Sequence, residues 1–288
     1  MSIDVTIKQK LFGSKTMPLE VILGQELSYG NWENDQLREG ELGEREFIAY
    51  APHAIGRGFS VIWNPSEKKA INLRLPQPST PEEMRLFYNC VARIADYWGG
   101  SLVVDGSRMK PEAFLAGFED MVVFNDRIID HFCEQILSGE SQNLTFYSAK
   151  WPLTIGLPEA EEFHTDHSSF ATWLHEKQSM DVFFCNPRFF MNDAGIYGQF
   201  MLMNDLPTVF PLKPNVPFGM TDPATGKALE CCQWRVVLVI ENQPGALCEI
   251  DYAQFLRSIP EDRKSRYDEN HFLLSGLSEQ EVRLLADL

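Results

Sequence analysis

The sequence predicts an α+β fold in which antiparallel hairpins form a sheet that is covered by helices. Pairs of short stretches alternate apolar and polar residues and are separated by turn-forming residues, which is typical of hairpins. Two longer stretches repeat apolar residues every three or four positions, which is typical of amphipathic helices. The order strand, strand, helix, strand, helix occurs over 58–137 and again over 235–286, so the chain can contain two similar units with this order.

The composition describes a folded chain. Its 288 residues are 44% hydrophobic and 12% aromatic, which is enough apolar surface to form a core. This length suits one or two domains of roughly 100–200 residues. We place the boundary between an N-terminal α+β unit, 1–150, and a C-terminal α+β unit, 151–288, which can also pack as one globule. The net charge of −16 argues against nucleic acid as a partner, because phosphates are bound by clustered Lys and Arg.

No segment predicts export or a membrane. Residues 2–8 alternate apolar and polar side chains, which predicts a strand and not a signal peptide. The longest strongly apolar run, 236–240, is far shorter than the ~20 residues of a membrane span. The six cysteines are scattered without a Cys-x-x-Cys pair, which favours buried free thiols. We therefore expect a cytoplasmic protein.

The first half contains the strongest helix signals. Thr80 or Ser79 is suited to cap a helix, Pro81 suits its first turn, and two glutamates follow where the helix dipole favours them. A pair of glycines after residue 98 ends this helix. The other elements predicted for this half are strands over 58–63, 70–75 and 101–105 and a helix over 111–137.

The segment 26–46 is the most acidic part of the chain. It holds seven acids and two arginines, interspersed with glycines, which predicts a long exposed loop or flap. A second segment, 183–190, is rich in aromatic residues and either packs in a core or lines an apolar pocket. Its one cation, Arg188, can stack on an aromatic ring or bind an acid. The candidate binding surface predicted from these two segments consists of Glu33, Asp35, Glu39, Glu41 and Arg188.

The second half alternates shorter helices and strands. Its last helix begins with a capping box formed by Ser278 and Glu281. A stretch rich in proline and glycine, 204–230, predicts a rigid connection more than a polyproline ligand. The predicted elements are helices over 158–163, 168–178, 251–258 and from Ser278, and strands over 181–185, 235–241, 246–250 and 271–274.

One cluster of metal-ligating residue types lies near the middle of the chain. Glu161, His164 and His167 are spaced at i, i+3 and i+6, so a continuous helix would bring them near one face. In the other interpretation, Asp166 caps a new helix and breaks this continuity. The acids would then be solvated and the histidines would be loop residues. The sequence leaves both interpretations open.

No phosphate-binding loop, nucleophile elbow or nucleophile–base set is found in the sequence. The sequence therefore favours a cytoplasmic, non-enzymatic binding or regulatory protein with an acidic surface and a partner that presents basic groups. The alternative is a metal-dependent hydrolase centred on Glu161, His164 and His167. No cofactor is predicted apart from a transition metal in this alternative, and the sequence does not indicate an oligomeric state.

Several stretches of the chain look familiar when they are taken together, and they comprise residues 47–50, 56–65, 115–119, 173–182 and 216–223. They resemble a family of uncharacterised bacterial proteins of about this length, found mainly in Gram-positive bacteria. The resemblance covers nearly the whole chain and implies a cytoplasmic bacterial protein. It implies no catalytic residues, because no activity is attached to these stretches.

Overall fold

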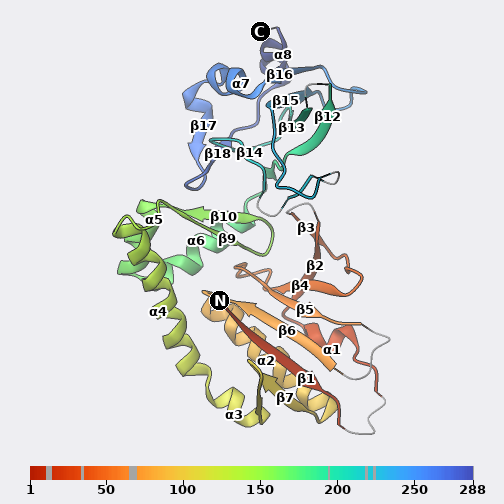
Figure 1. Ribbon diagram of the computed structural model, residues 1–288, viewed down its shortest axis with the longest axis vertical. Coiled ribbons are helices and arrows are strands. Elements are labelled where there is room, and N and C mark those ends of the chain that lie inside the picture. Colours follow the sequence, from red (N-terminus) through yellow and green to blue (C-terminus); the bar gives the residue numbers. More distant parts are fainter. Residues whose placement is uncertain are drawn as a thin grey trace. The chain divides into compact units, whose positions relative to one another are not determined.

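Figure 1 shows the computed structural model of the chain. It divides into two compact units, Met1–Met180 and Asp181–Leu288, each with its own hydrophobic core. The predicted α+β class is confirmed, because sheets with mainly antiparallel pairing are combined with helices in both units. The boundary predicted after residue 150 falls inside the first unit, where strands β9 and β10 pair across it. The structure describes residues 1–10, 15–33, 36–64, 70–193, 195–217, 220–222 and 225–287.

The first unit is built on an eight-stranded antiparallel sheet with the order β3-β2-β4-β5-β6-β1-β7-β8. The predicted first strand, β1, is confirmed and lies inside the sheet, between β6 and β7. Its apolar residues alternate with polar ones, so that Ile3, Val5 and Ile7 are buried on one face. The strands are β1 (Ser2–Lys8), β2 (Ser28–Glu33), β3 (Gln36–Glu39), β4 (Glu46–Tyr50), β5 (Phe59–Ile62), β6 (Ala70–Pro76), β7 (Ser101–Val104) and β8 (Ser107–Met109).

Helix α2 (Pro81–Trp98) covers this sheet and matches its prediction closely. The side chain of Thr80 accepts a hydrogen bond from the N–H of Glu83, and Gly99 ends the helix in the left-handed conformation. Phe87 packs edge-on against Phe59 of β5. The short helix α1 (Leu19–Leu23) is joined to α2 by Arg93, whose guanidinium donates to two carbonyls of α1. Such bonds satisfy groups that a helix C-terminus leaves without partners.

The predicted helix over 111–137 is two helices in the structure, α3 (Pro111–Ala116) and α4 (Phe118–Leu137). Gly117 leaves helical geometry with ψ near 7°, which the apolar periodicity on either side does not reveal. Helix α4 packs on α5 (Leu157–Thr165), which is followed by α6 (His167–Ser179). Together with the hairpin β9 (Leu144–Tyr147) and β10 (Pro152–Ile155), these helices enclose a cluster of aromatic rings.

The expectation that 26–46 forms a long exposed loop is wrong. Strands β2, β3 and β4 occupy most of it and form one side of the large sheet. Trp32 explains why an acidic segment is ordered here, since its ring contacts Tyr147 and its indole N–H donates to the carbonyl of Ala149. The side chains of Glu33 and Arg38 lie on the opposite face of this hairpin and are exposed.

The second unit contains two four-stranded sheets. One has the order β12-β13-β15-β16, with β13 and β15 parallel, and the other has the order β11-β14-β18-β17. The rings of Phe200, Phe210 and Phe272 meet between them in the core. The strands are β11 (Phe183–Phe184), β12 (Arg188–Asn192), β13 (Gly195–Met203), β14 (Thr208–Pro211), β15 (Gln233–Val239), β16 (Cys248–Asp251), β17 (Lys264–Arg266) and β18 (His271–Leu274).

The described residues of this unit also form two helices and a 3₁₀ turn, α7 (Tyr252–Ser258), Glu261–Arg263 and α8 (Glu279–Ala286). The capping box predicted at Ser278 and Glu281 is confirmed. The repeated element order does not produce a repeated topology. In the first unit β5, β6 and β7 belong to one sheet, whereas β16 and β18 of the second unit belong to different sheets. In the described parts of the chain, no helix combines the length and the apolar character that crossing a membrane requires.

Candidate functional site

Strand β12 lies at one edge of its sheet and carries exposed apolar side chains. It pairs with β13 on one side, and among the described residues no strand pairs with its other side. Phe190 is 41% exposed and Met191 is 73% exposed. Arg188, one of the residues predicted for the binding surface, begins this strand and is exposed. Exposed edge strands are templates for another chain, and most proteins protect them with charges or cover them.

The hydrogen bonds of β13 show which main-chain groups of β12 point to the open edge. The carbonyl of Ile196 accepts from the N–H of Cys232 at 2.8 Å, so the main chain of Ile196 points toward β15 and away from β12. Its cross-strand partner is Met191. Ile196 and Met191 are therefore a non-hydrogen-bonded antiparallel pair, in which both residues direct their N–H and C=O groups away from each other. Met191 therefore presents its donor and acceptor to the open edge, as does Phe189 two residues earlier.

Aromatic contacts hold β12 on both faces of the sheet. On one face, Phe190 stacks on Tyr197 with ring centroids 5.6 Å apart, and the guanidinium of Arg235 lies 4.9 Å from the Tyr197 ring. On the other face, Phe189 meets Trp234 edge-on at 6.0 Å. These contacts fix the position of the strand while its outer edge stays open.

Gly198 of β13 leaves the space that the contact between Phe189 and Trp234 needs. It lies opposite both Phe189 and Trp234 in the sheet. A Cβ atom at this position would be 2.2 Å from the Trp234 ring, so only glycine leaves room for the indole.

The predicted acidic residues lie in the first unit and are partly neutralised there. Glu33 forms an ion pair with Arg38 at 3.4 Å, and Glu39 forms one with Lys150 at 2.6 Å. Glu41 is exposed, and Asp35 lies outside the described residues. Burial and the neighbouring Glu39 raise the pKa of Tyr50 to about 12. The local bases reduce the negative field that the sequence alone suggests for this surface.

The structure brings the side chains of His164 and His167 together at one carboxylate of α4. Asp166 accepts from the N–H of Ser168 and caps α6, so the helix is broken as one of the two interpretations predicted. Both histidines instead reach Asp130 of α4, with His167 Nε2 at 2.8 Å and His164 Nδ1 at 3.2 Å from the same carboxylate oxygen. The hydrogen bond from His167 is the largest cause of a lowered Asp130 pKa.

This cluster is partly exposed and joins α4 to α5 and α6. His167 Nδ1 is also 3.8 Å from a carboxylate oxygen of Asp126, one turn before Asp130. Within the described ranges, no group of three or more His, Cys, Asp or Glu side chains is arranged to hold a metal ion. The metal-dependent hydrolase centred on Glu161, His164 and His167 stays a prediction from the sequence, which metal analysis of the purified protein can test.

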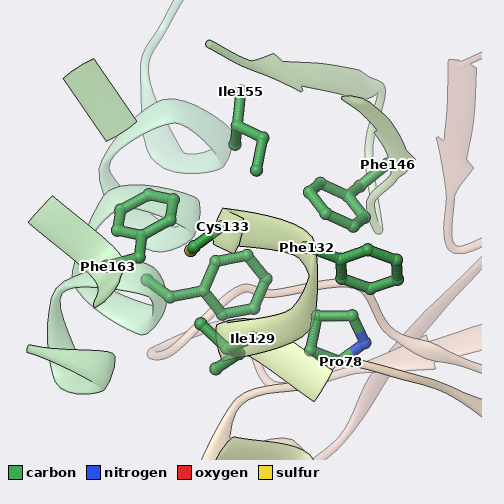
Figure 2. Close-up of a pocket in the computed structure, with 8 residues that line it drawn as sticks. Pro78, Ile129, Phe132, Cys133, Phe146, Ile155 and Phe163 are labelled. Carbon is green, nitrogen blue, oxygen red and sulfur yellow. The ribbon is translucent and has the colours of Figure 1, made fainter. Parts of the chain in front are cut away.

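The interior of the first unit contains a small apolar cavity among α4, α5, α6 and the β9–β10 hairpin (Figure 2). Its volume of about 10 Å³ is room for about one water molecule and not for a substrate. Burial raises the pKa of Cys133 in its wall to about 11, so this thiol is not a nucleophile at neutral pH. The residues that line it are Pro78, Ile129, Phe132, Cys133, Phe146, Ile155, Phe163 and Phe170.

The prediction of buried free thiols is confirmed for three of the six cysteines. Cys90, Cys133 and Cys185 are buried free thiols, and burial raises the pKa of each. Cys232 is exposed, and its neighbour Cys231 is partly buried.

The chain belongs to a family described as a domain of unknown function, DUF4299, whose model matches residues 2–285. No curated protein and no solved structure matches the chain. The resemblance of nearly the whole chain to an uncharacterised family is therefore confirmed, and the family description names no activity.

Proposed function

We propose that this protein is a non-enzymatic binding protein that takes an extended segment of a protein partner as an added strand along β12. The observation that carries the proposal is the open edge, where Phe189 and Met191 present main-chain donors and acceptors beside exposed apolar side chains. Addition of a strand at a sheet edge is a common way to bind a peptide, because main-chain hydrogen bonds supply affinity and alternate side chains supply specificity.

The charges at the ends of β12 indicate which partner segment fits best. Arg188 begins the strand and Asp193 follows its last residue, with Phe189, Phe190 and Met191 between them. An antiparallel segment with an acid near Arg188, a base near Asp193 and apolar residues between them complements this pattern. The acidic residues Glu33 and Glu39 support binding less strongly than predicted, because each already has a base beside it.

Fluorescence anisotropy with labelled peptides tests the proposal. The probes are nine-residue peptides that alternate valine and threonine and carry an aspartate at one end and a lysine at the other. We expect saturable binding with a dissociation constant in the roughly micromolar to millimolar range. A probe with two prolines in its centre is the matched control, because it cannot form the main-chain bonds.

A pair of variants at one position makes the test specific for the edge. Met191→Pro removes an N–H that points outward and leaves the bonds to β13 in place, so it should abolish binding. Met191→Val keeps the N–H and an apolar side chain, so it should bind as the wild type does. Equal binding by both variants, or no saturable binding by any probe, would refute the proposal.

A further inference from the structure

We infer that the strand added along β12 is β12 of a second copy of this chain, in a two-fold antiparallel pairing centred on Phe190. This inference rests on the proposed function, because it uses the same open edge. It commits the edge to one occupant, and its evidence is the symmetry of the strand and the placement of its charges.

The outward main-chain groups are placed symmetrically about Phe190. They belong to Phe189 and Met191, one residue before and one residue after it. When two copies align about Phe190, Phe189 of each lies opposite Met191 of the other, and each opposite pair exchanges two hydrogen bonds. This register satisfies every outward donor and acceptor of the three central residues.

The neighbouring two-fold registers satisfy fewer of these groups. A shift by one residue toward the N-terminus centres the pairing on Phe189 and places Met191 opposite Pro187, which has no N–H to donate. The opposite shift centres it on Met191 and places Phe189 opposite Asp193, which lies in the turn after β12. Pairing is therefore most complete when Phe190 is the centre.

The side chains are compatible with the same register. Phe190 meets Phe190 of the second copy, so the stacked pair of Phe190 and Tyr197 continues across the two-fold axis as a row of four rings. On the other face, Met191, which is 73% exposed, packs against Phe189 of the second copy. The most exposed apolar side chain of the strand is thereby covered.

The charges at the two ends of β12 favour a second copy of this chain as the added strand. Antiparallel pairing places Arg188 opposite the uncharged Asn192 and next to Asp193 of the second copy, once at each end of the strand pair. Opposite charges therefore approach each other twice, and no like charges lie directly opposite within the paired strands. This matters in a chain of net charge −16, which repels its own copies at long range.

The result is a continuous sheet of eight strands, four from each copy. The contact is made by one five-residue strand on each side, which is smaller than a standard interface. We therefore expect a dimer whose population rises with protein concentration.

Sedimentation velocity of the full chain, from about 5 μM to about 1 mM, measures this association. The wild type should shift from its monomer mass of 32.9 kDa toward twice that mass as concentration rises. Met191→Pro should stay monomeric, and Met191→Val should associate as the wild type does. Circular dichroism of both variants confirms that the fold is kept.

A charge exchange tests the register itself. Arg188→Asp and Asp193→Arg should each weaken the dimer by roughly tenfold or more, because either variant alone brings like charges together. An equimolar mixture of the two variants should associate again, because both charge pairs then join opposite charges. A labelled copy of one variant allows the mixed dimer to be counted.

The outcomes separate the two proposals. A wild type that stays monomeric at every concentration and still binds the peptide probes overturns the second copy and leaves the proposed function standing. A dimer that forms equally in Met191→Pro, or variants whose mixture does not associate, overturns the pairing through β12. A monomeric protein that binds no probe overturns both proposals.

Discussion

Replacement of Glu83 by alanine should destabilise the first unit far more than replacement of its neighbour Glu82. Glu83 is 1% exposed, at the start of α2, and its carboxylate accepts three hydrogen bonds. The donors are the N–H of Arg57 at 2.9 Å, the N–H of Gly58 at 2.5 Å and the hydroxyl of Ser79 at 3.0 Å. This one side chain therefore joins the loop before β5 to the helix that covers the sheet.

The expected loss of unfolding free energy in Glu83→Ala follows from the three donors that lose their acceptor. A buried donor that loses its acceptor costs about 1–3 kcal/mol. Three such donors give about 3–9 kcal/mol, and water that enters the space left by the side chain lowers this toward about 3–5 kcal/mol. By contrast, Glu82 forms ion pairs with Arg85 and His53 near the surface. Surface pairs of this kind contribute at most about 1 kcal/mol.

Urea denaturation followed by tryptophan fluorescence provides the assay. Five of the six tryptophans, at 32, 63, 98, 151 and 173, lie in the first unit, and Trp234 lies in the second. The fluorescence signal therefore reports mainly on the first unit. Glu83→Gln should fall between wild type and Glu83→Ala, because its amide oxygen accepts and its NH₂ group cannot. A difference of less than about 1 kcal/mol between Glu83→Ala and Glu82→Ala would show that the three bonds do not stabilise the fold as argued.

Three further predictions concern single residues. Gly198→Ala should displace the ring of Trp234 and lower both the melting temperature and peptide binding, so an unchanged melting temperature would contradict the close contact in the sheet. Asp130→Asn should destabilise the protein at pH 7 and lose this effect in acid. The folded-state pKa of Asp130 is lowered by its histidine neighbours, so its contribution is present above its unfolded pKa and disappears as pH falls through the folded value. Glu281→Gln should behave likewise, because hydrogen bonds from the cap of α8, together with Arg263, lower the pKa of Glu281 from 4.5 to about 2. Its destabilisation, measured as a difference in melting temperature from wild type, should be complete above about pH 5 and vanish near pH 2, and a constant difference over this range would disprove the assignment.

The local sequence is sufficient to predict those helices and strands whose ends are determined by neighbouring residues. Helix α2 begins after Thr80 and ends at Gly99, where a capping hydroxyl and a left-handed glycine were expected. The capping box of α8 and the alternation of β1 were equally direct. In each case the residues that decide the structure lie within a few positions of one another.

Contacts between distant segments explain where the predictions were incomplete. The acidic segment 26–46 is ordered as strands because the indole N–H of Trp32 donates to the carbonyl of Ala149, more than a hundred residues away. His164 and His167 share the carboxylate of Asp130, whose place beside them depends on how α4 packs on α5 and α6. No spacing along the chain carries that information.

The candidate site shows the same division. The sequence alone predicts an α+β chain that resembles an uncharacterised family, with one cation, Arg188, within the aromatic segment 183–190. The tertiary structure decided that Arg188 and the residues after it form a strand, β12, at the edge of a sheet, because strand order depends on pairing between residues far apart in the chain. It also decided that Phe189 and Met191 direct their main chains outward, since that direction is set by the hydrogen bonds of β13 to its other neighbour. Composition and periodicity act along the chain, whereas an open edge is a property of the assembled sheet.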